Sequence, residues 1–216
     1  MSSCIDHLII TAPTLEAGAA FLRQTLGVTP GPGGKHPRMG THNRLLRLGD
    51  GLFLEVIAID PQAPGPGRPR WFGLDRLGTD ALPSLAGWVA RCDDIRGAAA
   101  ASTEALGKIE PMTRGALDWL ITIPDDGTLP LGGAGPALIA WHAPIHPAAT
   151  LSEHGLSLVK LEIFHPEPGR IERLLRALDF DGLLSVSALP ASAQPYLSAR
   201  IGTPHGVREL RTASAG

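Results

Sequence analysis

The segment IDHLIITAPTLEAGAAFLRQTLG (residues 5–27) decides the fold. It opens with an apolar run typical of a strand, and apolar residues then recur along one face of a helix. These residues are Leu15, Ala19, Leu22 and Leu26. The hydroxyl of Thr14 suits the N-cap of that helix, and Gly27 suits the left-handed turn that ends one. The segment therefore predicts a strand followed by a helix.

The same pattern returns 80 positions later in LAGWVARCDDIRGAAAASTEALG (residues 85–107). Asp94 takes the N-cap position of Thr14, and Gly107 takes the position of Gly27. Self-similarity at a fixed spacing indicates a repeated structural unit. We therefore expect Gly27 and Gly107 to end equivalent helices.

Further strands are expected after each helix. In the first copy they are residues 43–48 and 52–59, with a short extended piece after Val28, and in the second copy they are residues 116–123 and 137–141. A third, weaker copy has strands at 156–164, 183–189 and 196–201, with a helix after the first of them. The first two copies thus read as strand, helix and three strands, a βαβββ unit, and the third reads as an abbreviated copy.

Composition excludes several classes of protein. The 216 residues are 44% hydrophobic and 19% charged, with a formal net charge of −2, which is typical of a globular protein. Scattered basic residues argue against nucleic acid or an anionic membrane as partner, and no apolar run is long enough to span a bilayer. Only Cys4 and Cys92 are present, which favours a reducing compartment, so we expect a cytoplasmic protein.

Several short motifs carry a family resemblance. They are IDHL (residues 5–8), HPRMGTHN (36–43) and LFLEV (52–56), with RWFGL (70–74) and HP (146–147) in addition. With them, the chain resembles the glyoxalase-like-domain proteins of the vicinal-oxygen-chelate superfamily. The resemblance implies an α+β fold in which paired βαβββ units form a cupped mixed sheet, and the third copy adds an abbreviated unit to it.

The expected limits follow from the repeats. They are a first unit at 1–60, a linker loop at 61–80, a second unit at 81–145 and a third, abbreviated unit at 156–210. The resemblance implies that the concave face of the cupped sheet holds a divalent metal or a bare ligand pocket. We therefore expect a small-molecule ligand as partner, and a homodimer is left open.

His7 and Glu55 match the metal-ligand positions of the superfamily. Strand alternation places His7 on one face with Ile5 and Ile9, and Glu55 on one face with Phe53 and Ile57. Polar side chains among apolar neighbours need partners. Three hypotheses stay open: the pair holds a metal, the two side chains hydrogen-bond each other or a nearby Arg, or Glu55 is a catalytic base with a pKa raised by burial and His7 as its catalytic partner.

The second unit departs from the metal pattern. Gly87 corresponds to His7 and Ala140 to Glu55, so half of the expected ligands are missing. Because catalytic zinc sites use three protein ligands, we expect no cofactor or only a weakly held divalent metal.

Other candidates would bind a ligand. His42 and Asn43 adjoin on one strand, so at most one of them faces the cup. Nearby His36 is expected on a solvated loop, with a substrate clamp as the alternative. Arg70 would pair with a ligand carboxylate or be exposed, and the remaining candidates, Trp71, Trp119 and Trp141, would line an apolar pocket or belong to the core.

Two functions of different class follow from these residues. The first is a glyoxalase-like lyase or isomerase that acts on a small oxygenated compound and uses His7 and Glu55. The second is a metal-free protein that binds or sequesters a small molecule without catalysis. The His7 and Glu55 pair favours the enzyme, whereas the missing ligands at Gly87 and Ala140 favour the binding protein.

Overall fold

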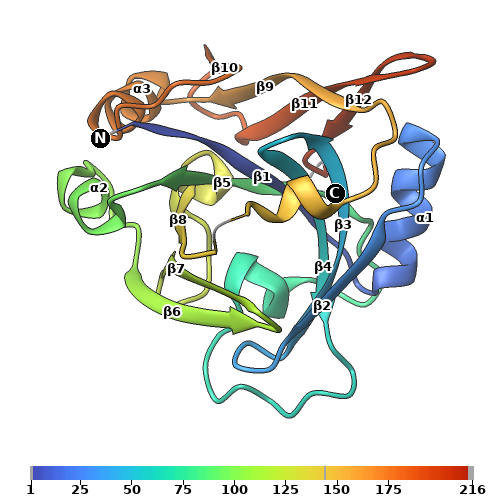
Figure 1. The fold of residues 1–216 in the computed structure, drawn as a ribbon. Helices are drawn as coiled ribbons and strands as arrows, with labels where there is room; N and C mark the ends of the chain where they lie inside the picture. The colour runs from blue at the N-terminus through green and yellow to red at the C-terminus, as the bar shows by residue number, and fades with distance from the viewer. Residues whose placement is uncertain (1, 144, 214–216) are drawn as a thin grey trace.

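The computed structural model describes residues 2–143 and 145–213, where the βαβββ order occurs three times (Figure 1). The first unit contains β1 (Ser3–Thr11), α1 (Leu15–Leu26), β2 (Gly31–His36), β3 (Thr41–Gly49) and β4 (Leu52–Ile59). The second contains β5 (Ser84–Cys92), α2 (Ile95–Ala101), β6 (Lys108–Arg114), β7 (Leu117–Ile123) and β8 (Ala137–Trp141). The third contains β9 (Ser157–His165), α3 (Pro168–Ala177), β10 (Leu184–Ala188), β11 (Tyr196–Thr203) and β12 (Gly206–Arg211). Short 3₁₀ helices are η1 (Trp71–Arg76), η2 (Pro130–Gly133) and η3 (Pro147–Thr150).

The first two units share one mixed sheet of eight strands. Its order is β2-β3-β4-β1-β5-β8-β7-β6. Within each unit the first strand runs parallel to the last, and β1 pairs antiparallel with β5 to join the units. The sheet curls into a half-barrel (Figure 1), which confirms the expected cupped sheet of paired βαβββ units.

The two faces of this sheet belong to different cores. The convex face packs against the helices and the third unit, through residues such as Leu8 of β1, Leu22 of α1 and Leu161 of β9. The concave face has a separate apolar cluster that includes Ile9 and Ile57 and is covered by η1. The helices therefore cover only the convex face, and the concave face is available for a site.

The third unit forms a sheet of its own, with strand order β10-β9-β11-β12. In this sheet β10 runs parallel to β9, whereas β11 and β12 follow antiparallel. Strand β12 was not expected from the sequence, because Val207 and Leu210 are its only large apolar residues and they do not alternate.

The helices of the first two units begin alike but end differently. Thr14 and Asp94 are both N-caps whose side chains accept from a backbone N–H three residues later. Gly27 ends α1 as expected, but α2 ends at Ser102, so the expectation that Gly107 ends it is wrong. The Ser102 hydroxyl accepts from the backbone of Glu104, a local bond that competes with a further helical turn.

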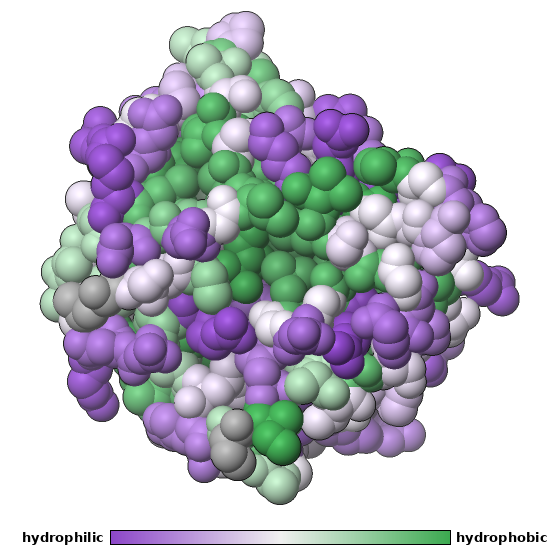
Figure 2. Space-filling model, turned by 45° about the horizontal axis from the view of Figure 1, so that its top comes forward, coloured by the Kyte–Doolittle hydropathy of each residue, from purple (hydrophilic) through white to green (hydrophobic). Residues whose placement is uncertain are grey.

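Among the described residues, no helix is long and apolar enough to cross a membrane. Figure 2 shows the molecule with the top of Figure 1 tipped forward. Hydrophobic residues gather in a hollow near the centre of this face, and hydrophilic residues surround it.

Candidate functional site

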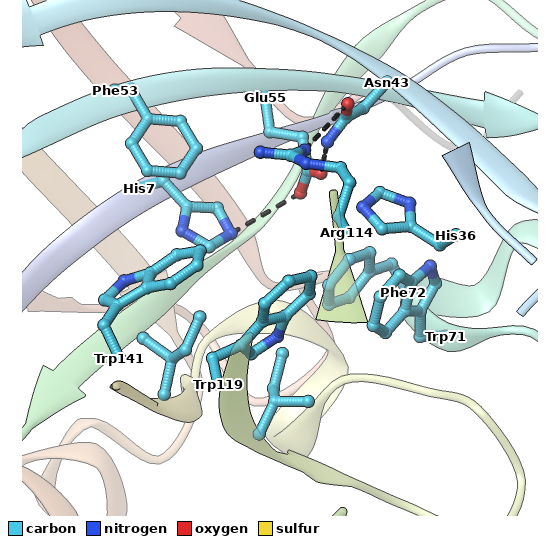
Figure 3. Close-up of a pocket in the computed structure, with 12 residues that line it drawn as sticks. His7, His36, Asn43, Phe53, Glu55, Trp71, Phe72, Arg114, Trp119 and Trp141 are labelled. Carbon is cyan, nitrogen blue, oxygen red and sulfur yellow. Dashed lines mark hydrogen bonds and ion pairs between the residues drawn. The ribbon is translucent and has the colours of Figure 1, made fainter. Parts of the chain in front are cut away.

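A pocket on the concave face brings together side chains of both units (Figure 3). Six of the eight candidates proposed above line it: His7, Asn43, Glu55, Trp71, Trp119 and Trp141. The other lining residues are His36, Phe53, Phe72, Arg114, Ile121 and Ile139. The cavity between these side chains is small, about 20 Å³, and the space around it, open solvent at the mouth included, is about 350 Å³.

A β-bulge in β1 determines which side chains reach this pocket. The register of β1 against β5 shifts between Ile5 and His7. An extra residue at a bulge breaks the strict alternation of a strand. Ile5 consequently packs with Leu8 in the helix-side core, so the expectation that it shares a face with His7 is wrong. The side chain of Asp6, expected on the opposite face, reaches His7 instead.

Asp6 is fully buried and bonds three side chains. Its carboxylate lies 2.6 Å from Nδ1 of His7, accepts from Nε1 of Trp141 at 2.9 Å, and lies 2.9 Å from Nε2 of His146. Burial alone would raise the pKa of Asp6, but the bonds to His146 and His7 outweigh it and lower that pKa below its usual range. Asp6 is therefore a buried anion beneath the pocket.

His7 lies between two carboxylates. Its Nε2 is 3.4 Å from Oε2 of Glu55, so the predicted pairing of these two residues is confirmed, and its ring stacks on Phe53 with centroids 4.6 Å apart. Burial would lower the pKa of His7, but the bonds and charges of Asp6 and Glu55 raise it to about 9. At neutral pH His7 is thus an imidazolium.

Glu55 faces the pocket from β4 and is held on both carboxylate oxygens. Oε1 accepts from Nδ2 of Asn43 at 2.5 Å, and Oε2 faces His7. Burial by itself would raise the pKa of Glu55, but the bond to His7 and its charge lower it to about 2. The hypothesis of a raised pKa for Glu55 is therefore wrong for the free protein, because a buried cation compensates the burial.

Asn43 connects the first unit with a cation from the second. Its Oδ1 accepts from the backbone N–H of Gly34 at 2.8 Å and from Nη1 of Arg114, at the end of β6, at 3.0 Å. These donors fix the amide so that its NH₂ points to Glu55. Sequence analysis missed Arg114, since its approach depends on how the sheet curls.

His36 was expected on a solvated loop, with a substrate clamp as the alternative. It is 4% exposed at the end of β2, so the position on a solvated loop is wrong. Burial lowers the pKa of His36 to about 4, so its ring is neutral. Trp71 donates to Oγ1 of Thr41, and the same hydroxyl lies 3.2 Å from Nδ1 of His36. If the hydroxyl donates to Nδ1, the ring proton of His36 is on Nε2.

The signal that could have located His36 is weak. Strand β2 reads GPGGKH, which has no apolar alternation to show which side chains face inward. A turn through Met39 and Gly40 lets His36 pair with Thr41, and only this hairpin register places it.

Aromatic rings form most of the apolar wall. The ring centroids of Trp119 and Trp141 are 5.1 Å apart, and Trp71 stacks on Phe72 at 5.2 Å. Phe72 has a φ of 60°, in the left-handed region that a bulky residue seldom adopts. Such conformations persist only where the surroundings enforce them. Here the conformation places the ring of Phe72 beside that of Trp71 in the pocket wall.

His42 and Arg70 do not line the pocket within the described chain. His42 precedes Asn43 on β3 and therefore faces the other side of the sheet. The guanidinium of Arg70 pairs with Asp75 at 2.6 Å and donates to the carbonyl of Gly40 at 3.4 Å. Arg70 thus holds the segment that carries Trp71.

Comparison with known proteins identifies the family. The family model of the glyoxalase-like domain matches residues 5–178. The chain belongs to the glyoxalase-like domain family. A search of curated proteins finds no match. Among solved structures, a hypothetical protein from Staphylococcus aureus matches with a TM-score of 0.59 at 12% identity, covering 88% of this chain and 87% of that one. This likeness shows the fold.

Two named enzymes also match more weakly. Methylmalonyl-CoA epimerase from Streptomyces coelicolor has a TM-score of 0.43 at 18% identity, over 64% of this chain and 97% of that one. A mutant of 4-hydroxymandelate synthase from the same organism has a TM-score of 0.49 at 21% identity, over 97% of this chain and 62% of that one.

The glyoxalase-like family implies a metal, but the residues of the second unit do not fit one. A Cβ on Gly87 would lie 2.3 Å from Cδ1 of Leu129, so a ligating side chain there would have to displace the leucine. Ala140 was matched with Glu55, yet it packs in the helix-side core, and the residue that faces the pocket is Ile139. Within residues 2–143 and 145–213, no group of three or more His, Cys, Asp or Glu side chains is arranged to hold a metal ion.

The first unit does not fit a transition metal either. Nδ1 of His7 is bonded to Asp6, which leaves Nε2 of His7 and the carboxylate of Glu55 as the two possible ligands. Catalytic zinc sites use three protein ligands. The donor set of the first unit is therefore one ligand short of such a site.

Proposed function

We propose that this glyoxalase-like protein is a lyase or isomerase that moves a proton next to a carbonyl group of a small oxygenated compound. The observation that carries the proposal is the chain of Asp6, His7 and Glu55, which is buried and ends in an aromatic pocket. Titratable groups whose environments push their pKa values apart are typical of acid–base sites. Here the pKa of His7 rises to about 9 and that of Glu55 falls to about 2.

Glu55 is the base in this proposal. Each of its oxygens retains a free lone pair beside the bonds to Asn43 and His7. A carboxylate with a pKa of about 2 is a weak base in the free protein. A ligand that displaces water and places an oxygen anion nearby would raise the pKa of Glu55, so that the base gains strength when the site is filled.

His36 and Arg114 would hold the ligand oxygen. When Glu55 takes the proton from carbon, the C–H electron pair moves toward the carbonyl oxygen and forms an enolate. The neutral Nε2–H of His36 and the guanidinium of Arg114 both line the pocket and can donate to that oxygen. Return of the proton to the same or another carbon completes an isomerisation, and loss of a neighbouring group completes an elimination.

The proposal assigns no step to a cofactor, because the donor set does not fit a transition metal. Elemental analysis of protein purified without an affinity tag or chelator should find less than one equivalent of transition metal, and a stoichiometric metal would contradict this. Cys4 and Cys92 are both free thiols, which supports a cytoplasmic location for the enzyme.

Deuterium exchange tests the proposed activity. The protein is incubated in D₂O with a panel of small 2-oxo acids, 2-hydroxy ketones and aryl ketones, and NMR follows deuterium at the carbon next to each carbonyl. Wild type should catalyse exchange in at least one compound, and Glu55→Gln should slow it by about 100-fold or more. Glu153→Gln, which changes a half-exposed carboxylate paired with Arg47, should leave the rate unchanged.

A binding protein without catalysis is the second candidate. The observation that favours it is the low pKa of Glu55, which makes its carboxylate a weak base. A protein that only holds its ligand needs no base. This candidate predicts saturable binding in the pocket with no exchange in wild type. Binding by the panel without exchange would therefore overturn the enzyme and support sequestration.

A further inference from the structure

Arg114 is a partly buried cation without a carboxylate partner. It ends β6 in the second unit and extends across to the first unit (Figure 3). In the part of the chain that the structure describes, its only hydrogen bond is from Nη1 to Oδ1 of Asn43 at 3.0 Å, and it forms no ion pair. A guanidinium has five N–H donors, so most of them are left for another group.

The neighbouring anions are already engaged. Glu55 is the nearest negative charge that acts on Arg114, but its two oxygens bind Asn43 and His7. The buried charges of Asp6 and His7 satisfy each other in the same way. Because buried charges are normally paired, a free guanidinium at a pocket indicates a missing anion.

We propose that Arg114 binds the carboxylate of the ligand, which makes the ligand a small carboxylic acid with an apolar body. This inference deepens the proposed function and rests on the same pocket. The body of the ligand would lie against Trp119, Trp141 and Phe53, which line the pocket with Arg114. A carboxylate fits because a guanidinium can donate to both of its oxygens in parallel.

Arg114 is open to an approaching anion. It lines the inner pocket and also an outer groove formed by residues 32–35, Leu117, Pro147 and Leu151, among others. Lys35, the other cation of that groove, is already paired with Asp60 at 2.9 Å. Arg114 is thus the cation at the junction of groove and pocket that has no carboxylate of its own within the described residues.

The backbone of β2 makes room for this arginine. Gly34 has no side chain, and a Cβ there would lie 2.5 Å from Cδ of Arg114. The backbone N–H of Gly34 donates to Oδ1 of Asn43, and this oxygen also accepts from Arg114. The arginine is therefore held in place before any ligand arrives, a condition that lowers the entropic cost of binding.

Matched probes test the charge preference. Phenylacetate and phenylacetamide have nearly the same shape, but only the first is an anion. Their dissociation constants are measured by ligand-observed NMR at low salt, for wild type, Arg114→Gln, Arg114→Lys and Arg76→Gln. Arg76 is an exposed arginine paired with Asp126, so its variant controls for the loss of one positive charge.

Wild type and Arg76→Gln should bind phenylacetate about ten-fold more tightly than the amide, or better, because a hydrogen bond to a charged group exceeds a neutral one. Arg114→Gln should lose this preference. Arg114→Lys keeps the charge but not the two-pronged donor, so its preference should fall between the two. If Arg114→Gln does not fold, as circular dichroism would show, the lysine variant decides.

Three results would overturn the inference. They are equal affinity of wild type for both probes, an unchanged preference in the Arg114 variants that fold, and no saturable binding of phenylacetate. The inference and the proposed function can fail separately. A charge preference without deuterium exchange would support the anion site at Arg114 and contradict the proposed enzyme activity. Exchange without a charge preference would support the activity and contradict the anion site.

Discussion

Nδ1 of His7 lies 2.6 Å from Oδ1 of Asp6, the residue directly before it in the chain. Neighbours on a regular strand point to opposite faces, so this contact exists only because β1 has a bulge at this point. The bulge thereby supplies the carboxylate that keeps His7 charged.

Replacing Asp6 with Asn should destabilise the protein. The change retains the shape but removes the negative charge that His7 and Trp141 bind, and it leaves a buried imidazolium less compensated. We expect a loss of about 3 kcal/mol in the free energy of unfolding, measured by urea denaturation. Asp118→Asn, which breaks an exposed pair with His142, should cost less than about 1 kcal/mol. Equal losses for the two variants would contradict the role of Asp6.

Stability should decline on the alkaline side because of His7. Its pKa is about 9 in the folded protein against 6.5 ordinarily, so its contribution is complete below pH 6.5 and is lost as the pH rises through 9. The loss should be on the order of 3 kcal/mol. Urea denaturation across this range measures it, and His7→Gln should lack the decline. A flat profile in wild type would contradict the charged state of His7.

On the acidic side, His36 and Glu55 act in the same direction. His36 has a folded pKa of about 4, below its ordinary 6.5, so the unfolded chain binds more protons as the pH falls from 6.5 through 4. The contribution of Glu55 is complete above pH 4.5 and is lost as the pH falls through 2. Stability should therefore be greatest near pH 6.5, and NMR titration of the histidine ring protons checks both imidazole pKa values.

Two tryptophans that touch each other should respond differently to phenylalanine. Trp141→Phe removes the indole N–H that donates to Asp6 at 2.9 Å, and we expect a loss of about 2 kcal/mol in unfolding free energy. Trp119→Phe retains an aromatic wall, and no hydrogen bond of its indole occurs among the described residues, so it should cost about 1 kcal/mol less. Thermal unfolding of both variants at one pH makes the comparison. A larger loss of unfolding free energy for Trp119→Phe than for Trp141→Phe would contradict the role given to the bond between Trp141 and Asp6.

Gly27 and Gly107 both have positive φ but differ in the space around them. No atom lies within 4 Å of a Cβ built on Gly27, so Gly27→Ala should cost only about 1 kcal/mol of left-handed strain. A Cβ on Gly107 would lie 2.2 Å from the backbone of Ile123 and Pro124, which cannot easily move. Gly107→Ala should therefore unfold at a clearly lower denaturant concentration than Gly27→Ala. Equal midpoints of unfolding would contradict the expected clash at Gly107.

The pairing of His7 with Glu55 was predictable, and the reason is topological. The first and last strands of a βαβββ unit are adjacent, and alternation on β4 is regular, so Phe53 and Glu55 keep the face that the sequence indicates. Asp6 was not predictable, because nothing in the local sequence marks a bulge at that residue.

Arg114 and His36 illustrate a second limit. Their side chains reach the pocket because the strands at the two edges of the sheet, β6 and β2, curl toward each other. That closure results from the twist of the whole sheet, which no short segment specifies. Local patterns therefore located the residues on β1 and β4 and missed those on the edge strands.

The two units contribute different kinds of residue to the pocket. The first unit supplies Asp6, His7, Asn43 and Glu55 on β1, β3 and β4, while the second supplies Ile121 and Ile139, which carry no polar atom in their side chains. Mutation at these two positions can alter which ligand fits without disturbing the proposed proton transfer. Relatives that keep the network but differ there would be expected to share a reaction while accepting different molecules. Trp141 and Arg114 are exceptions, because Trp141 is bonded to Asp6 and Arg114 to Asn43, so both link the choice of ligand to the charges of the site.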